Sequence, residues 1–208
     1  MINIKDINHN IDIDEFTDFY IKMVNRNLNH LGVHSKNTAI LSVMLASEFG
    51  FKPYDIKILN FGAILHDIGK IFVPAEILNA SRVLTSVEFE IIKTHTTAGW
   101  EALNNFKSLP SEIKSFAISH HYRNGFGYPK HLIYSVDIDS VLVDILTVAD
   151  SFSAILEPRA YKKPVSETEA FKIISDSNND KNAGLNCDVL YRLKYLIDNK
   201  KISLNSFF

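Results

Sequence analysis

A histidine and an aspartate stand side by side in the segment Leu65–Lys70, at the end of an apolar run. A neutral imidazole nitrogen and an anionic carboxylate form a mixed ligand set that Fe, Mn, Zn or Ni accept. The two oxygens of Asp67 could bridge two cations, and Lys70, one helical turn after His66, could lie beside a phosphate. The dipeptide alone is a weak signal, because a helix end often carries incidental polar residues.

Further ligand-type residues are spread along the chain. Asp150 interrupts an apolar helix, and a buried carboxylate is costly unless it is paired or coordinated. His34 is expected to open a helix, and His95 falls inside one. Neighbouring helical residues diverge by about 100°, so His120 and His121 face one cation only if the helix turns away there. Each residue alone fits an ordinary structural role, but together they predict a metal site.

Helices must position these residues, since apolar side chains recur mostly every three or four residues. The predicted helices span residues 14–28, 34–49, 53–68, 85–105, 110–121, 138–157, 166–177 and 186–199. Thr85–Glu88 has the spacing of a capping box at a helix start. Gly69 is expected to let the chain leave its helix, and Ser175–Asn186 is expected to be a loop. No strong alternating strand pattern is found, so the predicted fold class is all-α.

The bulk composition excludes several classes of protein. The 208 residues fit one domain, predicted as a helical prefix over residues 1–30 and a main domain over residues 31–208. A net charge of −2 gives no basic excess for polymeric nucleic acid or an anionic membrane. Cys187 is the only cysteine, which excludes an intrachain disulfide. Without a signal-peptide pattern or an apolar run of ~20 residues, we expect a soluble, cytoplasmic protein.

The order and spacing of these motifs resemble the HD-GYP branch of the HD phosphohydrolases. The resemblance covers roughly residues 30–195 and rests on His34, His95 and the segments 64–78, 84–90, 120–129, 149–150 and 159–162. It implies an HD-domain helical bundle with a di- or trinuclear metal centre, usually of iron or manganese. It also implies hydrolysis of a cyclic dinucleotide, typically cyclic di-GMP, to the linear dinucleotide and often to mononucleotides.

The resemblance also implies roles for individual residues. The ligands implied for one metal are His34, His66, Asp67 and Asp150. Those implied for the second metal are His95, His120 and His121, with Asp67 bridging. Asp67 and Lys70 are the residues predicted to serve catalysis. The metals that Asp67 would hold activate water and neutralise charge on the phosphate. The residues implied to contact substrate are Lys70, Tyr128, Arg159 and Lys162.

The chain departs from the family pattern at two places. Many members have a glutamate four residues before the first ligand histidine, where it contributes to a third metal. Here that position is His30, which brings no negative charge and argues against a third ion. The loop pattern His-His-Glu-x-x-Asp-Gly-x-Gly-Tyr-Pro is one residue shorter here, lacks its glutamate and has Asn124 in place of the aspartate. Gly125 and Gly127 are expected to allow close approach or a positive φ, and Tyr128 to stack on a guanine, so this loop is a candidate contact for substrate or a protein partner.

Two other functions stay open from the sequence. One is an HD phosphohydrolase acting on another nucleotide, such as a mixed cyclic GMP–AMP, because the metal ligands would be shared and the base pocket would decide. The other is a receptor or interaction module that binds metal or cyclic dinucleotide without turnover, for which the altered loop is the main support. The presence of both His66 and Asp67 favours the enzyme.

Overall fold

The computed structural model describes residues 12–27, 29–130, 138–157, 165–179 and 184–202. Regular structure in these residues is helical throughout, which confirms the predicted all-α class. The α-helices are α1 (Ile13–Asn27), α2 (Asn29–Phe49), α3 (Pro53–Leu65), α4 (Ala75–Leu78), α5 (Ser86–Lys93), α6 (His95–Asn104), α7 (Ser111–Ser119), α8 (Ser140–Leu156), α9 (Glu167–Asn179) and α10 (Cys187–Asp198). Two short 3₁₀ helices are η2 (Ile68–Phe72) and η3 (Arg123–Gly125).

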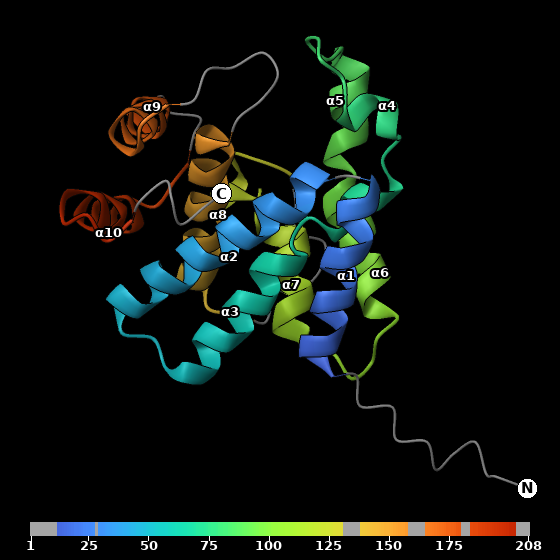
Figure 1. The fold of residues 1–208 in the computed structure, drawn as a ribbon, viewed down its shortest axis with the longest axis horizontal. Helices are drawn as coiled ribbons and strands as arrows, with labels where there is room; N and C mark the ends of the chain where they lie inside the picture. Colours follow the sequence, from blue (N-terminus) through green and yellow to red (C-terminus); the bar gives the residue numbers. More distant parts are fainter. Residues whose placement is uncertain (1–11, 28, 131–137, 158–164, 180–183, 203–208) are drawn as a thin grey trace, which may run out of the picture.

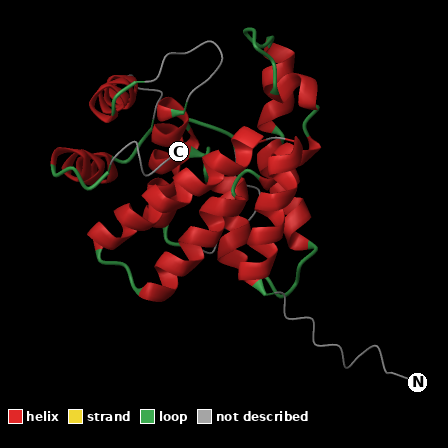
Figure 2. Cartoon of the chain, viewed as in Figure 1, coloured by secondary structure: helices red, strands yellow, loops and turns green. Residues whose placement is uncertain are grey.

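Helices α2, α3, α7 and α8 form the centre of the bundle, and α2 packs along both α3 and α8 (Figure 1). Helices α1 and α6 lie on one side of this centre, and α9 and α10 lie on the other. Helices α4 and α5 extend away from the body of the molecule, joined by a loop (Figure 2). The central helices therefore have enough neighbours to bury polar side chains as well as apolar ones.

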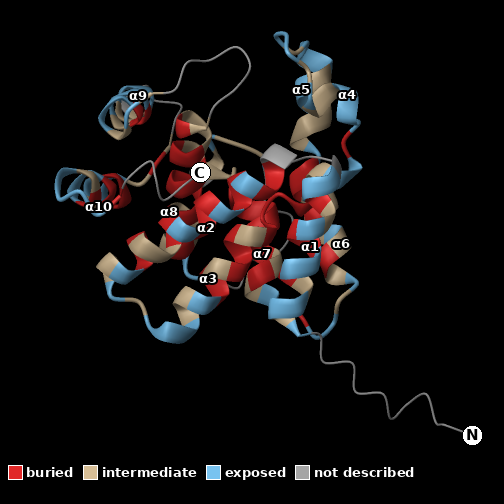
Figure 3. Ribbon diagram, viewed as in Figure 1, coloured by how far each residue is buried: buried red, intermediate tan, exposed pale blue. Residues whose placement is uncertain are grey.

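The buried side chains concentrate where the central helices meet (Figure 3). Leu59, Phe116 and Phe152 have no exposed surface, and burying an apolar side chain of this size contributes roughly 1.5–3 kcal/mol. In α8 the buried positions fall on nearly every side of the helix, and Asp150 is among them. No helix among the described residues is both long enough and apolar enough to cross a membrane.

The predicted helix over residues 85–105 is wrong, because the structure divides it at Thr94 into α5 and α6. The Thr94 hydroxyl donates to the carbonyl of Ile91 at 2.7 Å, and the His95 ring bonds the carbonyl of Ile92 at 2.7 Å. Side chains that bond the preceding turn compete with the backbone ladder and help to end a helix. The start of α5 was predicted correctly, since Thr85 and Glu88 form a capping box.

Four further predictions of local structure differ from what is observed. Helix α2 begins at Asn29, so His34 lies inside a helix and does not open one. Helix α3 ends at Leu65, and α9 runs on to Asn179 into the predicted loop. Gly69 lies within η2, where its role is close packing, because a Cβ atom there would lie 1.9 Å from the carbonyl oxygen of His95. The division of the chain at residue 30 stays a prediction.

Candidate metal centre

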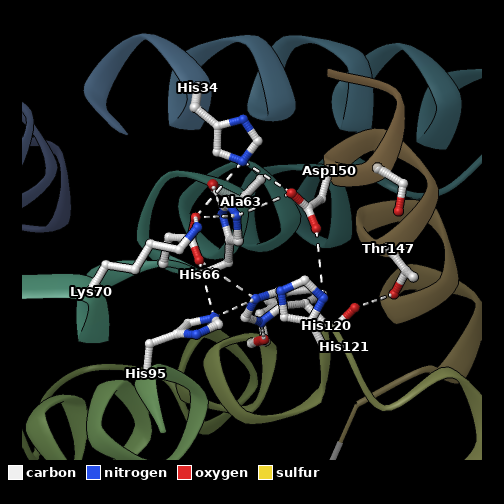
Figure 4. Close-up of polar contacts among 12 residues, drawn as sticks. His34, Ala63, His66, Lys70, His95, His120, His121, Thr147 and Asp150 are labelled. Carbon is white, nitrogen blue, oxygen red and sulfur yellow. Dashed lines mark hydrogen bonds and ion pairs between the residues drawn. The ribbon is translucent and has the colours of Figure 1, made fainter. Parts of the chain in front are cut away.

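The seven side chains predicted as metal ligands converge in one region where α2, α3, α6, α7 and α8 meet, and Figure 4 labels all of them except Asp67. They form two groups, within each of which the candidate ligand atoms lie no more than 4.8 Å apart. The first group is His34, His66 and Asp150. The second group is Asp67, His95, His120 and His121. All seven are buried except His121, which is partly buried.

The first group joins three helices. Nε2 of His34, on α2, lies 3.0 Å from Oδ1 of Asp150 on α8. Nε2 of His66, at the end of α3, lies 3.8 Å from the same oxygen. The packing of α2 against α3 and α8 thus brings a ring nitrogen of His34 and one of His66 to the carboxylate of Asp150.

Asp67 faces both groups through its two oxygens. Oδ2 lies 3.3 Å from Nε2 of His66 and 3.8 Å from Nε2 of His34. Oδ1 lies 3.2 Å from Nε2 of His95 and 3.7 Å from Nε2 of His120. A carboxylate placed in this way has the orientation needed to bridge two cations.

The second group depends on two helix ends. His95 begins α6, and His120 and His121 follow the last residue of α7, so the helix does end where both histidines must turn. The rings of His120 and His121 have centroids 4.1 Å apart, and Nε2 of His95 lies 3.2 Å from Nε2 of His120. The Thr147 hydroxyl donates to the His120 carbonyl at 2.8 Å and fixes this end of α7 against α8.

Hydrogen bonds to the backbone define which ring nitrogen of three histidines faces inward. Nδ1 of His66, His95 and His120 lies within 3.0 Å of the carbonyl oxygens of Ala63, Ile92 and Phe116, respectively. Because a carbonyl only accepts, each Nδ1 carries a proton, and the second nitrogen of each ring, Nε2, faces inward.

These inward-facing nitrogens could hold a cation. The Nε2 atoms of His95 and His120 face each other at 3.2 Å beside Oδ1 of Asp67, and Nε2 of His66 is buried without a hydrogen bond. Acceptors that converge on acceptors repel one another unless a positive ion lies among them. The donor set, imidazole nitrogens with carboxylate oxygens, therefore fits a divalent transition metal.

The electrostatics of the two groups differ. Burial lowers the pKa of His120 to about 4, and the nearby His66 and His95 act in the same direction, so this ring is neutral at pH 7. Burial also lowers the pKa of His34, but the hydrogen bonds that its ring donates to Asp150 and Glu157 outweigh burial and raise it to about 10. Burial alone would raise the pKa of Asp67, yet Lys70 and the surrounding histidines hold it well below its usual value.

The sequence profile of the HD domain family matches residues 18–182, which is most of the chain. This chain belongs to the HD domain family. The match confirms the expected HD-domain bundle, and it agrees with the HD-GYP resemblance carried by the motifs.

Individual relatives of this HD domain carry related names. A cyclic di-GMP phosphodiesterase of Thermotoga maritima is 40% identical over 147 residues, which are 68% of this chain and 38% of that protein. A 3'3'-cGAMP-specific phosphodiesterase 2 of Vibrio cholerae serotype O1 is 30% identical over 140 residues, 66% of this chain and 26% of that protein. The chain thus spans well under half the length of these curated relatives.

A solved structure of similar fold is an HDG"Y"P protein from Bdellovibrio bacteriovorus, with a TM-score of 0.66 and 18% sequence identity. The alignment covers 89% of this chain and 63% of that one. At this identity the likeness shows the fold alone.

The lysine and the loop tyrosine of this HD domain lie at the edge of the centre. Nζ of Lys70 is 2.5 Å from Oδ2 of Asp67, and 24% of the Lys70 side chain is exposed. The Tyr128 ring packs on His121 with centroids 4.6 Å apart, while its amide donates to the His121 carbonyl at 2.8 Å. The shortened loop needs Gly127 for this contact, because a Cβ atom there would lie 1.7 Å from the same carbonyl oxygen.

The structure does not describe the side chains of the remaining predicted residues. Arg159 and Lys162 fall outside the described residues, and the side chain of His30 is also not described.

The sequence did not predict one contact: Oε1 of Glu157 lies 2.8 Å from Nδ1 of His34. Its only signal in the sequence is an acidic residue at the carboxyl end of a predicted helix, where the helix dipole disfavours negative charge.

Proposed function

We propose that this HD domain is the catalytic domain of a metal-dependent phosphodiesterase that hydrolyses a cyclic dinucleotide, with cyclic di-GMP as the expected substrate. The observation that carries the proposal is the pair of ligand groups that share the Asp67 carboxylate. Adjacent cations are suited to phosphodiester hydrolysis, since they stabilise both the attacking and the leaving oxygen. The names of the curated relatives support a cyclic dinucleotide as the substrate class. A cytoplasmic location, predicted from the sequence, belongs with this proposal.

The proposed cofactor is a pair of divalent ions, of which iron and manganese are the expected elements. One ion would be held by His34, His66 and Asp150, and the other by His95, His120 and His121, with Asp67 shared. When bound, such ions lower the pKa of water and neutralise charge that develops on phosphate oxygens. His30 adds no negative charge, so a third ion is not part of the proposal.

The chain's own side chains would orient the substrate. Lys70 holds its ammonium beside Asp67 and keeps part of its length in solvent, so it can reach a phosphoryl oxygen at the edge of the centre. Tyr128 offers an aromatic face next to His121, on which a base could stack. Arg159 and Lys162 stay predicted phosphate contacts, and a protein partner at the loop containing Tyr128 stays a prediction as well.

The test is hydrolysis by the purified chain. Anaerobically prepared protein loaded with Fe(II) or Mn(II) is incubated with cyclic di-GMP, 3'3'-cGAMP or cyclic di-AMP, and products are separated by chromatography. We expect a linear dinucleotide or mononucleotides from cyclic di-GMP and no product with Asp67→Ala. Metal-loaded protein that releases no product from any of the three would contradict the proposal.

The same assay separates the two alternatives. Preference for 3'3'-cGAMP, the substrate named for the Vibrio cholerae relative, would keep the reaction class and change the base specificity. Tight binding of a cyclic dinucleotide without turnover would instead make the domain a receptor, as the shortened loop could allow.

A further inference from the structure

Glu157 contacts the ring nitrogen of His34 that points away from Asp150. Its Oε1 atom is 2.8 Å from Nδ1 of His34, and only 14% of the Glu157 side chain is exposed. The opposite nitrogen, Nε2, lies 3.0 Å from Oδ1 of Asp150. Both nitrogens of His34 are therefore held by carboxylates.

One helix supplies both contacts. Asp150 lies inside α8 and Glu157 is the C-cap residue of the same helix, with its amide bonded to the carbonyl of Ser153 at 3.0 Å. Helix α8 thus holds the His34 ring, which projects from α2, at two points. This arrangement fixes both the position and the rotation of the ring.

The partner of His34 differs in kind from those of three other histidines in the centre. His66, His95 and His120 each use a neutral backbone carbonyl behind the ring. His34 alone among these four has an ionisable carboxylate in that place. A carboxylate behind a ligand histidine orients the ring and makes it a more basic donor than a carbonyl does.

The position of Glu157 is unfavourable by local rules. Carbonyl groups at the carboxyl end of a helix carry partial negative charge, so they repel an acidic residue there. The contact with His34 gives a physical reason for glutamate at this position, because a hydrogen bond to an imidazole N–H offsets the repulsion.

We propose that Glu157 is a positioning residue that holds the proton on Nδ1 of His34 and so strengthens one of the two metal subsites selectively. The inference rests on the proposed metal centre. Glu157 touches neither metal nor substrate in this account. It acts through His34 on the ion that His34, His66 and Asp150 would hold.

The test is a metal titration that does not depend on turnover. The full chain, stripped of metal, is titrated with Co²⁺ in competition with a chelator, and the two binding steps are fitted separately. For Glu157→Ala we expect one step to weaken by about 10–100-fold and the other to change by less than about twofold. Glu157→Gln should lose less, because its amide oxygen can still accept the Nδ1 proton.

Two further variants identify the subsite and control for charge. His34→Ala should remove the same step that Glu157→Ala weakens. Glu101→Ala, which removes an exposed carboxylate on α6, should leave both steps unchanged. Long-range ¹H–¹⁵N spectra of the imidazoles report the proton on Nδ1 of His34 directly, and Glu157→Ala should alter that signal alone among the ligand histidines.

The outcomes separate this inference from the proposed function. If wild-type protein binds Co²⁺ in two steps and Glu157→Ala matches it, or weakens both steps equally, the role of Glu157 is overturned while the metal centre stands. If wild-type protein binds no Co²⁺, both fail together.

Discussion

Oδ1 of Asp67 lies 3.2 Å from Nε2 of His95, and this contact joins the N-cap residue of η2 to the first residue of α6. The other oxygen of Asp67 lies 3.3 Å from Nε2 of His66. One carboxylate therefore has a histidine nitrogen of each ligand group within 3.3 Å. Loss of its charge should affect both groups at once.

Asp67→Asn tests this shared role with little change in volume. An amide carries no negative charge and cannot bridge two cations as a carboxylate does, so we expect the bound metal to fall from two ions per chain to fewer than one. We also expect hydrolysis to fall by about 100-fold or more, which corresponds to roughly 3 kcal/mol of activation free energy. Elemental analysis and the chromatographic assay measure the two effects. Asp198→Asn, at an exposed ion pair on α10, is the matched control.

Single histidine variants should separate the two groups. His95→Ala removes a donor from the second group and leaves the first group with all of its residues. We expect this variant to retain about one ion per chain, bound with an affinity near that of the first site of the wild type. Retention of two tightly bound ions would show that His95 is not a ligand.

Metal binding at the first group should depend on pH. The pKa of His34 is raised to about 10, so this ring is protonated at pH 7 and must lose a proton when a metal binds. The apparent affinity of that site should rise about tenfold per pH unit across pH 7–9 and level off near pH 10. Calorimetry in buffers of different ionisation enthalpy counts the proton released.

The second group should differ, since the pKa of His120 is lowered to about 4 and its ring is already neutral at pH 7. In the metal-free chain, protonation of His34 also stabilises the fold, because the pKa of this ring is raised. This contribution is fully present below pH 6.5, the usual pKa of histidine, and is lost as the pH rises towards 10. Equal pH dependence at both sites would contradict the assignment.

Gly69→Ala should disturb the centre from a distance. The added Cβ atom would lie 1.9 Å from the His95 carbonyl oxygen and 2.6 Å from the Gly99 nitrogen, so η2 and α6 must separate. We expect a loss of about 1–3 kcal/mol in the free energy of unfolding and weaker metal binding at the second group. Gly50→Ala is the control: its φ of +77° makes alanine strained, but no atom lies within 4 Å of the added carbon. It should lower stability without changing metal affinity.

Much of the helical framework was predictable because local patterns decide it. The capping box at Thr85, the periodic apolar residues of α8 and the proline at the start of α3 mark helices through interactions within a few residues. The break at Thr94 was not predictable in the same way. The apolar period continues across it, and the side-chain hydrogen bonds of Thr94 and His95 that end α5 have no distinctive sequence pattern.

The candidate ligands could be named from residue type and motif order, and the structure brings all seven together. That they bind metal stays a prediction. Glu157 could not be found from sequence, because its partner His34 is 123 residues away and no local pattern links them. The role of Gly69 was mistaken for a similar reason: its conformation is ordinary, and only the packing of η2 on α6 requires the missing side chain.

The most direct test of the metal centre is a crystal structure of protein prepared anaerobically with Mn(II) or Fe(II), with anomalous data collected at the edge of that metal. We expect two anomalous peaks, one for each metal ion. Each ion should be bonded to a different oxygen of Asp67, with His66 as a ligand of one ion and His95 as a ligand of the other. A single peak, or peaks at which Asp67 is not a ligand, would contradict the account.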